Sequence, residues 1–343
     1  MSESDIIYMN RAFELAAQGL GQVSPNPMVG CAIVHDGKII GEGWHEKYGG
    51  PHAEVNAVNS VAEKSLLKDA TVYVTLEPCA HFGKTPPCAD LLVGHQVKRV
   101  VIANKDPFPL VNGGGIKKLQ HAGITVEIGV LAEKGREINK RFFSAVEKER
   151  PYIILKWAQT ADGFIARENF DSKWISNEHS RRLVHKWRAE EDAILVGTNT
   201  ARYDNPSLNV RDWQGKHPLR LVLDKKLGLD SKLNLFDRSI PTVCYNLQKD
   251  EVSENLVFKK VSEKNMIPDI LSDLHNRKIQ SLIVEGGSTL LNTFLSMDLW
   301  DEARVFTSNN TFGSGIAAPR VSGKLRRSEQ IKGDQLNIIL NEK

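Results

Sequence analysis

Cysteine is scarce in this chain, and its distribution is uneven. The 343 residues include only four cysteines, Cys31, Cys79, Cys88 and Cys244. So few thiols without a regular spacing do not indicate a disulfide-stabilised secreted protein, and a reducing cytosol is the expected compartment. Cys31 and Cys244 lie in apolar, strand-like stretches, where we expect core residues. Cys79 and Cys88, in contrast, lie close together in a polar, proline-containing segment.

Long apolar runs and an excess of one charge are also missing. No run approaches the roughly 20 residues that a membrane-spanning helix requires, and the opening residues 1–5 are too polar for a signal peptide. The net charge is only +3, with acidic and basic residues interspersed, which gives no basic surface of the kind that binds nucleic acid. We therefore expect a cytoplasmic protein that binds neither membranes nor nucleic acid.

The length permits two ordinary domains, each with its own core. In the first half, Met9 and Phe13 belong to an apolar pattern at helical spacing, and Asp36-Gly37 between two apolar stretches predicts a β-hairpin. Further strands are expected at 71–76, 97–103 and 124–128, and a charged helix over 133–150 stops at Pro151. We place the domain boundary at Arg150-Pro151, which gives domains 1–150 and 151–343.

The pattern of alternating strands and helices restarts after this boundary. Strands are predicted at 153–157, 193–197, 219–223, 242–245 and 281–284, and helices at 180–188 and 289–295. Such alternation is typical of an α/β domain. The sequence therefore predicts two consecutive α/β domains.

The strongest site signal is His52-Ala53-Glu54, followed by Pro78-Cys79 and then by Cys88. One imidazole and two thiols make a three-ligand zinc site with an open fourth position, and a spare carboxylate beside it can act as a base. Hydrolytic deamination needs this combination. A helix with Pro51 in its first turn would place His52 and Glu54 together, and the strand at 71–76 would deliver Cys79 to face them. We predict one zinc ion per chain, bound by His52, Cys79 and Cys88, with Glu54 as the catalytic residue.

Other interpretations of this cluster remain open. His81 could be a fourth ligand and make the zinc site structural, which leaves Glu54 without a role. A zinc-stabilised binding protein without activity is a second alternative, which an activity assay would decide. A nucleic-acid deaminase, such as one that acts on transfer RNA, would share the first motif. It predicts a short PCxxC and a basic face, however, whereas eight residues separate Cys79 from Cys88 here, and it explains nothing after Arg150.

A second site signal lies late in the chain. The apolar strand at 281–284 runs through Glu285 into Gly286-Gly287, and a helix follows. Backbone N–H groups at such a helix start can bind a phosphate. The same turn can be purely structural, and it is not GxGxxG, so a Rossmann fold is disfavoured.

The long cysteine spacing and its surroundings resemble the deaminase half of a known family, the bifunctional riboflavin-biosynthesis deaminase/reductases. The resemblance lies in His45 followed by His52-Ala53-Glu54, and in the segment from Pro78 to Cys88. The segment 24–30 resembles the substrate loop of that family. The segment 106–113 resembles another family segment, with Phe108 in place of an expected polar residue.

The second half resembles the reductase half of the same family. The matching motifs are Leu155-Lys156, Asp162-Gly163, the segment 172–176, Arg188-Ala189, and the segments 197–200, 204–211 and 285–287. The resemblance implies an N-terminal cytidine-deaminase-like domain and a C-terminal dihydrofolate-reductase-like domain. It also implies zinc and NADPH as cofactors and a small-molecule pyrimidine ribosyl phosphate as substrate, and we expect a homo-oligomer. The implied reactions are deamination of the pyrimidine and then reduction of its ribosyl group to ribityl.

The resemblance also implies residue roles. The residues implied to contact NADPH are Gln159, Trp174, Thr200, Asp204, Gly287, Ser288, Thr289, Leu290, Leu291, Asn292 and Thr293. In the reductase half, the residues implied to hold substrate are Ser172, Arg188, Leu208, Arg211 and Glu285. In the deaminase half they are Asn26, His45 and Lys84. Lys156 is a candidate polar group near the reacting sugar carbon. Arginine makes forked bonds to a sugar phosphate. Arg211 is the better candidate, because the stretch before it indicates a fixed loop.

Overall fold

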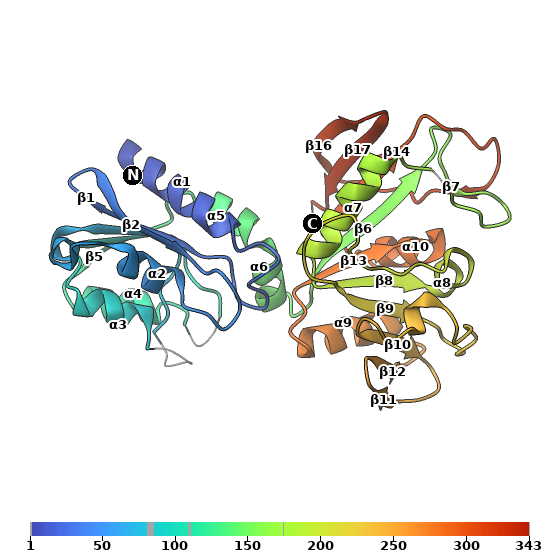
Figure 1. The fold of residues 1–343 in the computed structure, drawn as a ribbon, viewed down its shortest axis with the longest axis horizontal. Helices are drawn as coiled ribbons and strands as arrows, with labels where there is room; N and C mark the ends of the chain where they lie inside the picture. Colours follow the sequence, from blue (N-terminus) through green and yellow to red (C-terminus); the bar gives the residue numbers. More distant parts are fainter. Residues whose placement is uncertain (1, 81–85, 109–110, 174, 343) are drawn as a thin grey trace. The chain divides into compact units, whose positions relative to one another are not determined.

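The computed structural model describes residues 2–80, 86–108, 111–173 and 175–342. The chain divides into two compact units, Met1–Glu149 and Arg150–Lys343, each with its own sheet (Figure 1). Within the described ranges, no helix combines the length and the apolar character that a membrane crossing requires.

The first unit is built on a five-stranded mixed sheet. Its strands, in spatial order, are β2 (Lys38–Trp44), β1 (Gly30–His35), β3 (Thr71–Leu76), β4 (Arg99–Asn104) and β5 (Thr125–Ile128). Strand β1 pairs antiparallel with β2 and β3, whereas β3, β4 and β5 run parallel. Asp36 and Gly37 have positive φ angles of 47° and 71° in the β1–β2 turn, as an Asp-Gly hairpin turn requires. The predicted hairpin is therefore confirmed.

Helices cover both faces of this sheet. Helices α1 (Glu3–Ala17) and α5 (Ala132–Ile138) pack on one face around Phe13 and Tyr73. Helices α2 (Ala53–Ser60), α3 (Cys88–Gly94) and α4 (Gly114–His121) pack on the other around Cys31 and Val74, and a 3₁₀ turn spans Lys64–Asp69. Neighbouring residues of β3 thus belong to opposite cores, as strand geometry dictates. Cys31 is a core residue, as predicted.

The helix predicted over 133–150 is interrupted at Asn139. Helix α5 ends at Ile138, and α6 (Lys140–Glu147) begins immediately after Asn139. The buried Asn139 side chain accepts the Met28 N–H and donates to the Met28 carbonyl, both at 2.8 Å. The prediction of one continuous helix is wrong, because apolar spacing cannot reveal a contact with a residue so distant in the sequence.

The second unit is built on a ten-stranded sheet in the order β11-β12-β10-β9-β8-β13-β6-β14-β17-β16. Its parallel strands are β6 (Tyr152–Gln159), β8 (Ala193–Gly197), β9 (Leu219–Leu223), β10 (Thr242–Asn246), β12 (Leu256–Lys260), β13 (Ser281–Glu285) and β14 (Glu302–Thr307). The antiparallel edges are β11 (Glu251–Ser253), β16 (Lys324–Ile331) and β17 (Asp334–Leu340). Strands β7 (Phe164–Ala166) and β15 (Ile316–Ala317) form a separate pair.

Two layers of helices enclose the centre of this sheet. Helices α7 (Glu178–Glu190) and α8 (Thr198–Asp204) pack on one face with Trp187 and Cys244 in a common core. Helices α9 (Met266–Asn276) and α10 (Ser288–Ser296) pack on the other with Leu155 and Phe294, and a 3₁₀ turn spans Asn234–Phe236. Every strand and helix predicted for this half is present, and Cys244 is buried as expected.

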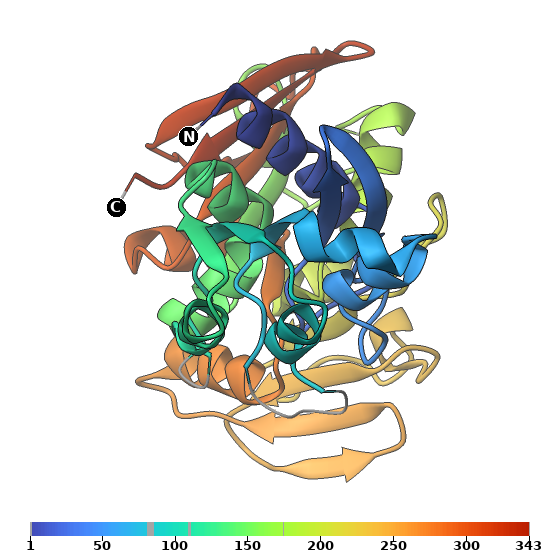
Figure 2. The ribbon, with the colours of Figure 1, turned by 90° about the vertical axis from the view of Figure 1, so that its left-hand side faces the viewer.

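The hairpin of β16 and β17 was not predicted. It forms one edge of the ten-stranded sheet, opposite the β11–β12 edge, and is drawn in red in Figure 2. Strand β16 is almost wholly exposed and carries mostly charged and polar residues. Without an apolar face, it offers no periodic signal that sequence reasoning could detect.

Candidate active sites

Three side chains meet at one point in the first unit. One ligand atom each from His52, Cys79 and Cys88 lies within 4.8 Å of the others. His52 Nδ1 lies 3.3 Å from Cys88 Sγ and 3.6 Å from Cys79 Sγ. Across the described ranges, no other His, Cys, Asp or Glu cluster has the spacing of a metal site. The fold therefore brings the three predicted ligands together.

Each ligand comes from the end of a different element. His52 is the N-cap of α2, Cys79 follows β3 after two residues, and Cys88 is the first residue of α3. The Cys88 N–H donates to Cys79 Sγ at 3.2 Å, which fixes the two cysteines relative to each other. Helix α2 begins at Ala53, so the prediction that Pro51 occupies its first turn is wrong.

The two thiols have very different proton affinities. The Cys88 thiol and N–H, together with the His52 ring, lower the pKa of Cys79 to about 4 in spite of its burial. The neighbouring Cys79 sulfur and burial in turn raise the pKa of Cys88 far above its usual range. A divalent cation stabilises two adjacent thiolates at once, and one imidazole with two sulfurs is a zinc-type donor set. The residues present therefore fit a zinc ion.

Glu54 lies in the first turn of α2, and its side chain interacts with those of Cys79 and Cys88. It is only 3% exposed. Burial, followed by the charge of Cys79, raises the pKa of Glu54 to about 6. A carboxyl group that titrates near neutrality can both take up and return a proton.

Asn26 is hydrogen-bonded to His45, whose ring lies next to that of His52. His45 Nδ1 lies 2.9 Å from the Pro51 carbonyl, so Nδ1 carries the proton and Nε2 accepts from the Asn26 amide at 3.0 Å. Burial lowers the pKa of His45, in keeping with a neutral ring. The His45 ring stands edge-on to the His52 ring, with centroids 5.7 Å apart. Lys84 and the alternative ligand His81 lie outside the described residues.

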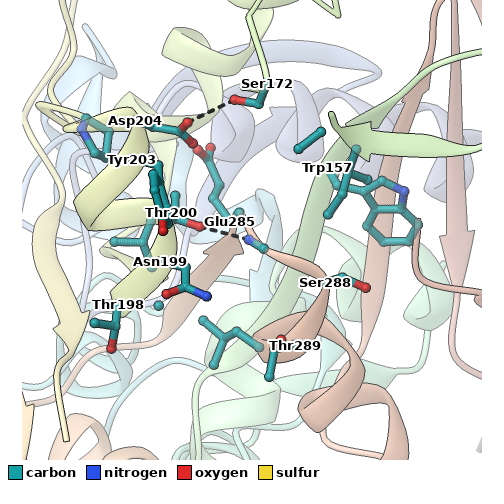
Figure 3. A pocket seen from close by; sticks show the side chains of 18 of the residues that line it. Trp157, Ser172, Thr198, Asn199, Thr200, Tyr203, Asp204, Glu285, Ser288 and Thr289 are labelled. Carbon is teal, nitrogen blue, oxygen red and sulfur yellow. Dashed lines mark hydrogen bonds between the residues drawn. The ribbon is translucent and has the colours of Figure 1, made fainter. Parts of the chain in front are cut away.

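The second unit contains a cavity of about 880 Å³, within the size range of cofactor and small-molecule sites. The predicted residues that line it are Lys156, Ser172, Arg188, Thr200, Asp204, Leu208, Arg211, Glu285, Gly287, Ser288, Thr289, Leu290 and Thr293. Figure 3 shows Thr200 and Asp204 of α8 on one side of this space, facing Glu285 at the end of β13 and Ser288 at the start of α10.

The remaining predicted residues are placed differently. Leu291 is fully buried in the core. Gln159 Oε1 accepts from Trp157 Nε1 at 2.8 Å, and Asn292 donates to Ser288 Oγ at 3.0 Å. None of these three side chains belongs to the described wall of the cavity. Trp174 lies outside the described residues.

A buried ion pair lines part of the cavity. Arg188 Nη2 donates to Glu285 Oε2 at 2.9 Å, and both side chains are about nine-tenths buried. Burial would raise the pKa of Glu285, but Arg188 and Lys156 outweigh it and lower that pKa, so Glu285 is an anion. Glu285 Oε1 and Arg188 Nε have no hydrogen-bond partner among the described residues. Because unpartnered buried polar atoms are costly, these two are available to a polar ligand.

The two glycines after Glu285 have a steric reason. Gly286 has a φ of 103°, and a Cβ there would lie 2.4 Å from Thr200 Oγ1. Gly287 is the N-cap of α10, and its N–H donates to Thr200 Oγ1 at 2.9 Å. The turn is thus held against α8, and the backbone at the start of α10 borders the cavity, as an anion site requires.

The other polar residues differ in how firmly they are held. Ser172 Oγ donates to Asp204 Oδ1 at 3.0 Å, and burial raises the pKa of Asp204. The Arg211 side chain is 57% exposed, against 11% for Arg188. Arg211 Nη1 donates to Asn209 Oδ1 at 3.2 Å, and Arg211 Nε lies 3.7 Å from Asp212 Oδ2. The Arg211 side chain also borders the cavity.

Two buried residues near the sites were not predicted. His185 lines the cavity one helical turn before Arg188, and that i, i+3 spacing is a signal that could have found it. Glu77 lies two residues before Cys79 and is 4% exposed. Its partners lie far along the chain, so no local pattern reveals its role.

Comparisons with known proteins agree on one family. Residues 2–104 match the cytidine and deoxycytidylate deaminase zinc-binding region, and residues 151–337 match the RibD C-terminal domain. The riboflavin biosynthesis protein RibD of Aquifex aeolicus is 43% identical over 321 residues, which are 92% of this chain and 90% of that protein. The chain belongs to the RibD family. The resemblance drawn from the motifs is therefore confirmed.

Solved structures of the family agree over almost the whole chain. A deaminase/reductase of Thermotoga maritima has a TM-score of 0.90 at 38% identity, covering 98% of this chain and 99% of that one. RibD of Acinetobacter baumannii has a TM-score of 0.90 at 34% identity, covering 99% of both. The chain is a bifunctional deaminase and reductase of riboflavin biosynthesis, with a cytidine-deaminase-like domain followed by a RibD reductase domain. These comparisons give no support to the alternative of a nucleic-acid deaminase.

Proposed function

We propose that residues 1–150 bind one zinc ion per chain through His52, Cys79 and Cys88, and that Glu54 is the catalytic acid-base residue. The observation that carries this proposal is the convergence of three ligand atoms within 4.8 Å beside a carboxyl group that is 3% exposed. Three protein ligands leave a fourth position for water, as in catalytic zinc sites.

The substrate of this site is a diaminopyrimidinone that carries a ribosylamino phosphate. Zinc, when bound, supplies the Lewis acidity that makes water nucleophilic near pH 7. Glu54 would accept the proton that the water loses and pass it to the ring nitrogen, and would then carry the proton of the new hydroxyl group to the amine, which leaves as ammonia. Asn26, held by His45, and Lys84 orient the pyrimidine and its phosphate.

We propose that residues 151–343 bind NADPH in the cavity of the second unit. In this proposal the cofactor contacts Thr200, Asp204, Gly287, Ser288, Thr289, Leu290 and Thr293, which line the cavity, and Trp174. Gln159, Leu291 and Asn292, whose side chains lie off the described wall, would contact it through their backbone. Support comes from the Gly286-Gly287 turn, which leads the backbone N–H groups of α10 to the cavity. The nicotinamide, when bound, supplies a hydride to the first sugar carbon. Lys156 and Asp204 are the polar groups that we assign to the surroundings of that carbon.

Ser172, Arg188, Leu208, Arg211 and Glu285 hold the ribosyl substrate in this proposal. Arg188 donates to Glu285 at 2.9 Å. We therefore assign Arg188 the role of holding that carboxylate and a polar group of the substrate in place. Arg211 is more exposed at the cavity wall, so its planar guanidinium is the better phosphate ligand.

The proposal also covers the cellular location, the oligomeric state and the partners of the enzyme. We propose that the enzyme is a cytoplasmic homo-oligomer that acts on small molecules and uses neither nucleic acid nor membrane as partner. We also propose that residues 1–150 and 151–343 work as separate functional domains, each with its own cofactor.

One experiment tests both halves of the proposal. Purified protein is incubated with the diaminopyrimidinone ribosylamine phosphate, with and without NADPH, and the products are weighed by mass spectrometry. We expect exchange of an amine for oxygen without NADPH, and a further gain of two hydrogens with it. A Glu54→Gln variant should retain zinc and reduce pre-deaminated substrate but release no ammonia. Loss of both activities in that variant would contradict two independent sites.

A further inference from the structure

We propose that Glu77 is the positioning residue of the deaminase site, which sets the place of the Cys79 sulfur and thereby the affinity for zinc. The inference rests on the proposed function only in taking Cys79 as a zinc ligand. Glu77 does not touch the reacting atoms in this scheme. It acts through the two residues that follow it, Pro78 and Cys79.

The Glu77 carboxylate is saturated with backbone hydrogen bonds. Its Oε1 accepts from the N–H groups of Gly115 and Ile116 at 3.0 and 3.2 Å. Its Oε2 accepts from Gly113 and Asp106 at 3.0 and 3.3 Å. With 4% exposure the group is removed from water, and a carboxylate without such donors would be unstable there.

These four donors belong to two features, the start of α4 and the segment 106–113. Gly115 and Ile116 lie in the first turn of α4, whose N-cap Gly113 provides no side-chain cap. Asp106 and Gly113 are the two ends of the segment 106–113 that resembles a family motif. Glu77 therefore ties the start of α4 and both ends of that segment to the end of β3, at the residue from which the chain leads to Cys79.

A close backbone approach reinforces this tie. A Cβ on Gly115 would lie 1.9 Å from the Pro78 carbonyl oxygen, so the first turn of α4 is pressed against the peptide between Glu77 and Cys79. On its other side, Cys79 is held by α3, because its carbonyl accepts from Ala89 N–H at 3.1 Å. Cys79 is thus fixed between two helix starts, and Glu77 makes the connection to one of them.

The hydrogen-bond donors around the Glu77 side chain call for acceptors on both of its oxygen positions. Four N–H donors require an acceptor with no hydrogens of its own, and an Asp or Glu anion is acceptor-only. Glutamine has the same shape, but its amide NH₂ would face two N–H donors at 3.0–3.3 Å. Glu77→Gln therefore changes the hydrogen bonding with almost no change in volume.

The test measures zinc affinity in the full-length protein, by competition with a chromogenic chelator. Outer residues that orient metal ligands typically contribute about 10- to 100-fold to metal affinity, so Glu77→Gln should raise the zinc Kd by that factor. The matched control is Asp5→Asn, which removes another buried carboxylate of the same unit that bonds to Arg99 and Tyr73. The control should lower thermal stability but leave the zinc Kd unchanged.

A second variant and a spectrum separate positioning from simple loss of stability. In cobalt-loaded protein, Glu77→Gln should shift the sulfur-to-metal absorption band, whereas Asp5→Asn should not. If Glu77→Gln does not fold, Glu77→Asp, which keeps the charge but retracts it, is compared in the same way. A zinc Kd within twofold of wild type in the folded variant, with an unshifted band, would overturn the inference. If wild-type protein bound no zinc, the proposed function would fail instead.

Discussion

Thr200 accepts the Gly287 N–H at 2.9 Å, so the start of α10 is bonded to α8 at the wall of the reductase cavity. The bond holds only because Gly286 has no side chain, since a Cβ there would lie 2.4 Å from the same hydroxyl oxygen. The position of the backbone N–H groups of α10 therefore depends on one glycine.

Gly286→Ala should weaken NADPH binding by about tenfold or more, which corresponds to about 1.4 kcal/mol. The added methyl group would push Thr200 away and move the turn. Gly163→Ala is the control, because Gly163 also has a positive φ, 86°, but nothing lies within 4 Å of its Cβ position. Titration of NADPH fluorescence measures both variants. Equal weakening in the two would point to backbone strain and not to the Thr200 contact.

Cys88→Ser should lose nearly all bound zinc, because a hydroxyl group is a poor substitute for a thiolate ligand. Metal analysis of the purified variant measures this loss. Cys31→Ser, a buried cysteine outside the ligand cluster, serves as the control and should keep its zinc if it folds. Full zinc retention in Cys88→Ser would argue for another ligand set, with His81 as the first candidate.

Arg211→Ala should raise the reductase KM for the ribosyl substrate by roughly ten- to a hundredfold, the value of a charge-assisted contact to phosphate. Arg211→Lys should recover only part of this loss, because an ammonium group cannot make the forked contact. Steady-state kinetics with varied substrate and with varied NADPH distinguish the two ligands. An effect confined to NADPH would mean that the two ligands are exchanged in the cavity.

A fragment from Pro151 to Lys343 should fold and bind NADPH without zinc, since every predicted cofactor contact lies within it. The unit Arg150–Lys343 has its own sheet and core. Circular dichroism and calorimetry test folding and binding. A soluble, folded fragment that shows no NADPH binding would indicate a site completed by another part of the enzyme.

Asp5 should make the first unit sensitive to acid. Its bonds to Arg99, above all, hold the pKa of Asp5 well below its usual range in spite of burial. A lowered folded-state pKa contributes stability that is present above the unfolded pKa, about 3.9, and lost as the pH falls through the folded pKa. Asp5→Asn should therefore lower the free energy of unfolding by about 2 kcal/mol at pH 7, with a smaller difference below pH 4.

Hydrogen exchange of peptides that span β1 and β3, measured in urea, reports this effect for the first unit alone. Glu127→Gln is the control, because Glu127 bonds to the same Arg99 but is 44% exposed, where such pairs contribute about 0–1 kcal/mol. A difference between wild type and Asp5→Asn that did not shrink with falling pH would contradict the assignment.

Local patterns in the sequence predicted what depends on local physics. Strand β3 has the bounds 71–76 that its β-branched run predicts, and the Asp36-Gly37 turn has the expected positive φ angles. The zinc motif could be recognised in the sequence because each of the three ligands lies in a short, characteristic stretch. The break at Asn139 and the role of Glu77 were not visible, because both depend on bonds to residues that are distant in the sequence.

The cavity shows the same division. The strand, glycine pair and helix at 281–295 can be predicted from the sequence. The hydrogen bond from Gly287 to Thr200 and the ion pair of Arg188 with Glu285 cannot. Such contacts require the order of strands in the sheet, which brings β8 next to β13. Single-sequence patterns do not specify that order.

The paired bonds between Asn139 and Met28 bear on how short a working deaminase could be made. The match to the zinc-binding region ends at residue 104, and all three proposed ligands lie before that point. The loop that carries Asn26, however, is anchored at Met28 by a side chain located between α5 and α6. A truncation after β5 would keep the three proposed ligands but remove Asn139 and its two bonds to Met28. A fragment that keeps this loop anchored therefore has to include Asn139, well beyond the region that the zinc motif marks.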